Sequence, residues 1–123
     1  MPTHGDPRSH LPLRPVEFEI LLVLLAGESH GYGIIKEAQD RWPGNGPMET
    51  GTLYRALRRL AAAGMVRPSD RRPAPGADDE RRRYFSITPF GRAVAAAEAR
   101  RLEAQVDVAR ARDLLPGTEG GAG

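Results

Sequence analysis

The sequence predicts a mainly α-helical domain with one small β-hairpin, in the order helix, helix, helix, strand, strand, helix. Three observations lead to this prediction. Apolar residues recur at helical spacing in four segments, clusters of proline and glycine separate those segments, and two short strand-like stretches flank a charged loop. At 123 residues the chain has the length of a single domain.

The composition excludes several classes of protein. Hydrophobic residues make up 40% and charged residues 28% of the chain, as in soluble globular proteins. Cysteine is absent, which excludes disulfides and thiolate chemistry. The longest apolar run, residues 20–26, is far shorter than the roughly 20 residues of a membrane span, and the first fifteen residues lack the apolar core of a signal peptide. We therefore expect a cytoplasmic protein that does not contact a membrane.

The N-terminal region combines a polar arm with a strongly apolar helix. Residues 1–14 are rich in proline and predict a flexible arm. Pro15 suits the first position of a helix, and only two glutamates interrupt the apolar segment 16–26. A helix that is apolar on all sides is buried on several of them. In so small a protein we expect a partner chain to cover part of this helix, at Val16, Ile20 and Val23.

Two further helices follow. Residues 27–31 are expected to form a turn, and the second helix to run over residues 32–41, where a segment rich in proline and glycine ends it. The third helix begins near Thr50 to Thr52, either of which could cap it. Gly64 ends this helix as a residue suited to a left-handed conformation.

The third helix carries the clearest functional signal. Leu53, Leu57 and Leu60 form its buried stripe, so hydroxyls, an aromatic ring and arginines occupy the opposite face. Arginine can bind phosphates or guanine edges with two parallel bonds, and hydroxyls donate to phosphate oxygens. On this helix alone, a solvated basic face would have the same composition. The candidate DNA-binding residues are Thr50, Thr52, Tyr54, Arg55, Arg58 and Arg59.

The predicted hairpin continues this basic region. Its strands are expected at residues 65–69 and 83–87, with residues 70–82 as a long exposed tip. Residues 51–92 hold ten arginines and four acids in a chain of net charge +2, which indicates one surface that faces a polyanion. Basic strands after a basic helix can form a wing that follows the DNA backbone while the helix enters the major groove. Arg67 and Arg83 border the tip, and the candidate DNA contacts are Arg71, Arg72, Arg81 and Arg82.

The last helix is predicted to form a dimer. A threonine followed by proline at residues 88–89 predicts its start, and residues 116–123 follow it as a flexible tail. It carries two apolar stripes on different sides, so that one can pack on its own domain and the other on a second subunit. The alternative is a helix that folds back along a monomer. The expected dimerisation stripe is Ala95, Ala99, Leu102, Val106 and Ala109.

The sequence contains no recognisable catalytic or metal site. None of its three histidines has a partner at metal-ligand spacing, and no phosphate-binding glycine motif follows a predicted strand. We therefore expect neither an enzyme nor a bound metal or cofactor.

Four blocks, in order, resemble the PadR-type transcriptional regulators. They are residues 30–34, 51–60, 64–66 and 83–91, of which the block that begins Gly-Thr-Leu-Tyr-Arg is the most specific. The resemblance covers about residues 15–112 and is similar to the branch with a short C-terminal part. It implies a winged helix-turn-helix domain over residues 15–88, with a recognition helix from Thr52 to Ala63, and a dimerisation helix over residues 89–115. It also implies a regulator that is usually a repressor and that often leaves DNA when it binds a small molecule.

Two functions therefore remain. The expected function is a sequence-specific transcriptional regulator, a repressor that binds a palindromic operator in double-stranded DNA as a homodimer and responds to a small-molecule effector. The alternative is a winged-helix module whose basic face binds an acidic protein partner. The salt dependence of binding distinguishes them, because each phosphate contact releases counterions.

Overall fold

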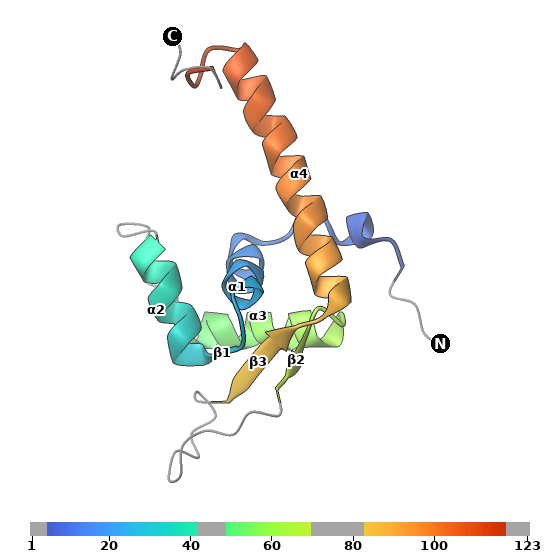
Figure 1. Cartoon of the computed structure of the whole chain (residues 1–123), viewed down its shortest axis with the longest axis vertical. Helices are drawn as coiled ribbons and strands as arrows, with labels where there is room; N and C mark the ends of the chain where they lie inside the picture. Colours follow the sequence, from blue (N-terminus) through green and yellow to red (C-terminus); the bar gives the residue numbers. More distant parts are fainter. Residues whose placement is uncertain (1–4, 42–48, 70–82, 118–123) are drawn as a thin grey trace.

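The computed structural model describes residues 5–41, 49–69 and 83–117 and confirms a mainly helical fold with a small antiparallel sheet (Figure 1). The tip of the predicted hairpin lies outside these residues. In chain order the elements are a 3-10 helix η1 (Pro7–His10), α1 (Pro15–Leu25), β1 (Ser29–His30), α2 (Gly31–Arg41), α3 (Thr50–Ala62), β2 (Val66–Pro68), β3 (Tyr84–Ile87) and α4 (Pro89–Ala111).

Helix α1 is the centre of the fold. It packs against α2, α3, α4 and β3, which surround it in Figure 1. The predicted burial on several sides is therefore supplied by the chain itself. Ile20 and Val23, which we expected to meet a partner chain, are only 0% and 2% exposed within one chain. Val16 is half-buried and packs on the same core.

The sheet has three strands in the order β1-β3-β2, all antiparallel. Ser29 lies opposite Phe85 on one side of β3, and Val66 lies opposite Ile87 on the other. The sequence predicts β2 and β3 but assigns residues 27–31 to a turn. That assignment is corrected at β1, because a strand of two residues is too short to show an alternating pattern.

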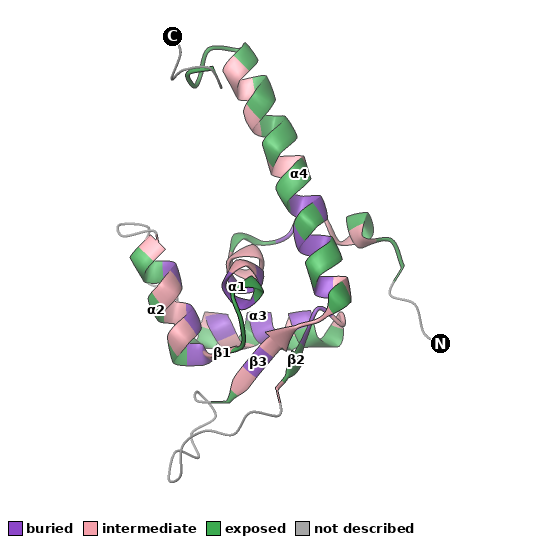
Figure 2. Ribbon diagram, in the orientation of Figure 1, coloured by how far each residue is buried: buried purple, intermediate pink, exposed green. Residues whose placement is uncertain are grey.

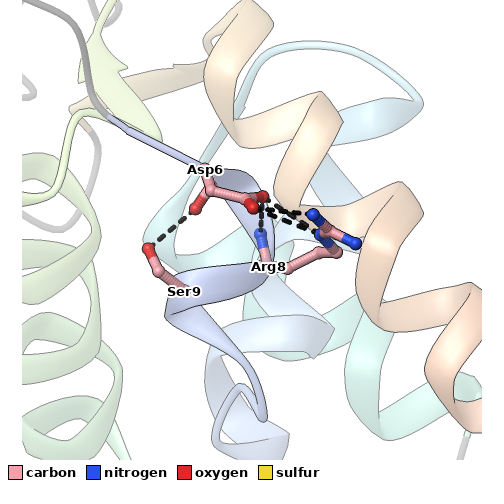
Figure 3. A network of polar contacts seen from close by, with 3 residues as sticks. All are labelled: Asp6, Arg8 and Ser9. Atoms are coloured by element: carbon pink, nitrogen blue, oxygen red, sulfur yellow. Dashed lines mark hydrogen bonds and ion pairs between the residues drawn. The ribbon is translucent and has the colours of Figure 1, made fainter.

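The N-terminal segment corrects the prediction of a flexible arm for residues 5–14. The side chain of Asp6 caps η1 by accepting a hydrogen bond of 2.9 Å from the backbone N–H of Arg8, and it also pairs with the Arg8 guanidinium (Figure 3). The ring of His10 lies edge-on to that of Phe90 on α4. Leu13 is buried in the core. A few apolar and capping residues thus dock a segment whose average composition is polar.

Helix α4 divides into a packed half and a projecting half. Thr88 caps its start as predicted, with its hydroxyl accepting from the N–H of Gly91 at 3.0 Å. All of its buried residues lie between Gly91 and Glu98, and the helix then extends away from the domain (Figure 2). It ends at Ala111, before the predicted end near residue 115, because Asp113 adopts a left-handed conformation with φ of 67°.

Glu98 is a buried carboxylate that joins the N-terminal segment to α4. It is 2% exposed and accepts hydrogen bonds from the backbone N–H of Leu13 at 3.0 Å and from the Arg101 guanidinium at 2.5 and 3.1 Å. The bond from Arg101 holds the pKa of the Glu98 carboxyl below its usual range, although burial acts in the opposite direction. The ionised form is therefore the one that the fold stabilises.

We predict that Glu98→Gln lowers the free energy of unfolding at neutral pH by about 1–3 kcal/mol, the contribution of hydrogen bonds to a charged group. A carboxyl with a lowered folded-state pKa stabilises the protein above its unfolded pKa, about 4.3 for glutamate. That contribution is lost as the pH falls through the folded-state pKa. Urea unfolding of both proteins should therefore show a difference at neutral pH that disappears in acid.

Glu103→Gln, at an exposed position of the same helix, is the matched control and should change stability by less than about 0.5 kcal/mol. A Glu98→Gln protein as stable as the unchanged protein at neutral pH would contradict the role given to this carboxylate.

Candidate nucleic-acid interface

Helices α2 and α3 meet at the start of α2, where glycine permits a close approach. A Cβ atom at Gly31 would lie 2.4 Å from the hydroxyl oxygen of Tyr54 and 3.2 Å from Leu53 Cδ2. The Tyr54 side chain therefore packs against α2. We predicted Tyr54 on the outer face of α3, and the structure corrects this placement. Position 54 borders the buried leucine stripe of α3, so the Tyr54 ring packs between α3 and the start of α2.

Arg59 is engaged by α1, although its side chain remains 37% exposed. Its Nε donates to Glu17 Oε2 on α1 at 2.9 Å, and the Glu17 side chain is only 12% exposed. The other oxygen of Glu17 accepts from the backbone N–H of Arg14 at 3.0 Å. Arg59 therefore connects α3 to the first turn of α1. We predicted it among the DNA-binding residues of α3, and the structure shows that it also contacts the domain.

The remaining predicted residues of α3 differ in exposure and in direction. Thr50, Arg55 and Arg58 are exposed, and Thr52 is half-buried. The Arg55 Nη2 atom donates to the Thr52 hydroxyl oxygen at 3.4 Å. At about 3.6 residues per turn, Thr52, Arg55 and Arg58 point away from the leucine stripe, with chemistry suited to phosphate oxygens and base edges. Thr50 instead lies on the leucine side of the helix.

The predicted cap of α3 is corrected. Glu49 occupies the capping position, with an extended backbone, and its carbonyl accepts from the N–H of Leu53 at 2.9 Å. Its side chain accepts no hydrogen bond from the helix. Thr50 and Thr52 instead lie within the first turn, so neither hydroxyl is used as the helix cap.

The base of the wing follows α3 directly. Arg67 on β2 and Arg83 beside β3 are exposed. The Ser69 hydroxyl donates to Glu28 Oε2 at 2.5 Å and so joins the end of β2 to the turn after α1. The wing candidates further along the hairpin lie outside the described residues; they are Arg71, Arg72, Arg81 and Arg82.

His30 is a positioning residue that the sequence did not identify. Its Nδ1 accepts from the backbone N–H of Gly33 at 3.0 Å, which satisfies a donor in the first turn of α2. Its ring lies edge-on to Tyr84 on β3 and Tyr32 on α2. His30 thus connects the start of α2 with the sheet. The sequence did offer one signal for this role. A side chain with a hydrogen-bond acceptor lies directly before the start of a helix, where such acceptors satisfy the first backbone N–H groups.

The expected dimerisation residues of α4 differ in how far their own chain buries them. Ala95 is 3% exposed and belongs to the core of its own chain, which corrects its predicted place at a partner. Ala99 is exposed, whereas Leu102, Val106 and Ala109 are half-buried. The stripe is therefore covered by its own domain only where it begins.

Residues 5–41, 49–69 and 83–117 hold no helix that is both long enough and apolar enough to cross a membrane. In the same three segments, no group of three or more histidine, aspartate or glutamate side chains could hold a metal ion.

Comparison with known proteins agrees with this architecture. The model of the Transcriptional regulator PadR-like family matches residues 20–97, more than half of the chain. A search of curated proteins finds no significant match.

Solved structures of low sequence identity have the same fold. A transcriptional regulator from Clostridium thermocellum is 24% identical, with a TM-score of 0.64 over 89% of this chain and 96% of that one. A PadR family transcription regulator from Clostridium difficile is 20% identical, with a TM-score of 0.64 over 77% and 94% of the two chains. RosR, in the complex hsRosR-S4, is 22% identical, with a TM-score of 0.64 over 89% and 96%. The fold is thus a winged helix, and the chain belongs to the PadR-like family of transcriptional regulators, which are DNA-binding proteins and not enzymes.

Proposed function

We propose that this regulator is a repressor that binds a palindromic operator as a homodimer and leaves it when a small-molecule effector binds. The observation that carries the proposal is the outer face of α3, where Arg55 and Arg58 are exposed, together with the exposed Arg67 on β2, a strand that contacts α3. The inward contacts of Tyr54 and Arg59 hold this face in place. A basic helix beside a basic strand suits a major groove and its flanking phosphates.

The projecting half of α4 supports the homodimer. It presents Leu102 and Val106, both half-buried, on the side of the helix that continues the stripe from Ala95. Soluble monomers rarely expose a long apolar surface. A second copy of α4 would cover it, because symmetric dimers bury the same patch on both subunits.

A two-fold axis between the α4 helices explains a palindromic operator. It would place the two α3 helices in successive major grooves, so that the half-sites lie about one helical turn apart. Repression follows when such a dimer covers a promoter. The effector rests on the family resemblance: a ligand that changes the angle between the α4 helices would move both α3 helices out of register.

The first test is selection of bound DNA from a random duplex pool, followed by footprinting. We expect an inverted repeat with half-sites centred about 34–36 Å apart. An asymmetric site without a repeat, protected by one subunit, would contradict the proposed palindrome.

The second test places charge on the exposed part of the dimerisation stripe. In Leu102→Glu with Val106→Glu, each carboxylate would be buried without a partner in the dimer, at high cost. We expect the dimer to dissociate and operator affinity to fall by orders of magnitude, as measured by sedimentation and by gel shift.

The matched control is Ala104→Glu with Ala111→Glu, which adds the same charge at exposed positions on the opposite side of the helix. This control should remain dimeric and bind the operator normally. A stripe variant that also remains a dimer with full operator affinity would contradict the proposed seam.

A further inference from the structure

We propose that Arg55, held by Thr52 over Gly51, is the residue with which α3 recognises guanine, whereas Arg58 binds phosphate. This inference rests on the proposed DNA-binding function and names the specificity-determining residue of that surface. It follows from the different surroundings of the α3 arginines, which the sequence alone does not distinguish.

The three arginines of α3 are chemically identical but structurally different. Arg59 is engaged by Glu17 of α1 at 2.9 Å and belongs to the packing of the domain. Arg58 is exposed and makes no hydrogen bond to any residue that the structure describes. Arg55 is exposed as well, but its guanidinium is held by the Thr52 hydroxyl at 3.4 Å. Arg55 is therefore the one exposed arginine of α3 whose guanidinium has a hydrogen-bond partner among the described residues.

Gly51 makes room for this orientation. A Cβ atom at position 51 would lie 3.3 Å from Arg55 Nη1 and 4.0 Å from Cζ, its nearest contacts outside the two chain neighbours and the local helix backbone. The guanidinium thus lies back over the first turn of α3, four residues before its own position. Glycine in a helix is unfavourable compared with alanine, so a glycine whose nearest neighbour is this guanidinium has a physical reason to be there.

A held arginine suits base recognition better than a freely moving one. Binding to guanine O6 and N7 requires two N–H groups of the guanidinium at a set angle. Arginine has five donors, and the bond to Thr52 uses one, so four remain. The restraint also reduces the side-chain entropy lost on binding. Residues near the start of a recognition helix are those that contact base edges, and Arg55 leans toward that end.

Arg58 suits phosphate binding for the opposite reason. An exposed arginine without a fixed orientation can follow the position of a phosphate, and phosphate contacts do not depend on the base sequence. Its replacement by lysine keeps the charge and should preserve most of its contribution to binding.

The test uses the full chain and the operator obtained by selection, with single guanines replaced by 7-deazaguanine, which lacks N7. For the unchanged protein, one such replacement in each half-site should weaken binding by roughly 5- to 150-fold. Arg55→Ala, which leaves no donor for guanine N7, should bind the natural and the modified operator almost equally. Arg58→Ala, the matched control, should bind both more weakly but discriminate between them as the unchanged protein does.

Two further variants separate orientation from folding. Thr52→Val removes the hydroxyl that holds Arg55, and Gly51→Ala crowds the guanidinium. Both should reduce discrimination between the two operators. Gly51→Ala, which removes no hydroxyl, should leave binding to random DNA unchanged. Gly51→Ala should at the same time raise the thermal stability of the protein, because alanine favours the helix, so lost discrimination cannot be ascribed to unfolding.

The outcomes separate the inference from the proposed function. If selection yields no duplex, the proposed function fails and this inference with it. If an operator is obtained but Arg55→Ala discriminates normally, or if Arg58→Ala abolishes discrimination, the protein binds DNA as proposed and the assignment of Arg55 is overturned.

Discussion

The burial of α1 is the constraint on which the rest of the structure depends. A helix that is apolar on all sides must be covered, and α2, α3, α4 and β3 each cover part of it. Its two charged residues are used to orient neighbours. Glu17 pairs with Arg59 of α3, and Glu19 pairs with Arg41 of α2. The hydrophobic effect therefore gathers the helices, and two ion pairs help to set how they face.

This arrangement links the proposed DNA-binding surface to the proposed dimer seam. The start of α4 approaches the connection after α3 so closely that a Cβ atom at Gly91 would lie 2.2 Å from the Met65 carbonyl oxygen. The Thr88 hydroxyl donates to the Gly64 carbonyl oxygen beside it. Since α4 is anchored to the end of α3, a change in the direction of one helix would be transmitted to the other. That coupling is what an effector of the proposed kind would use.

Much of this fold is predictable from local patterns, whereas the direction of individual side chains is not. Helical spacing, proline and glycine clusters and the Thr88 cap predict four helices and two of the three strands, and the leucine stripe predicts the buried side of α3. Arg58 and Arg59 are neighbours with the same chemistry, and only Glu17, 42 residues earlier, distinguishes them. The docking of the N-terminal segment likewise depends on Glu98, 85 residues from Leu13. Such contacts between distant residues leave no periodic pattern in the sequence.

The central claim, that the outer face of α3 and the wing bind the phosphate backbone of duplex DNA, is tested most directly by the salt dependence of operator binding. Each phosphate contact contributes a slope of about −0.9 to the logarithm of the binding constant against the logarithm of salt concentration. We expect a steep slope for the unchanged protein, and a slope reduced in magnitude by about one unit when Arg67, at the exposed base of the wing, is replaced by alanine. A shallow slope that Arg67→Ala leaves unchanged would contradict the account and favour an acidic protein partner.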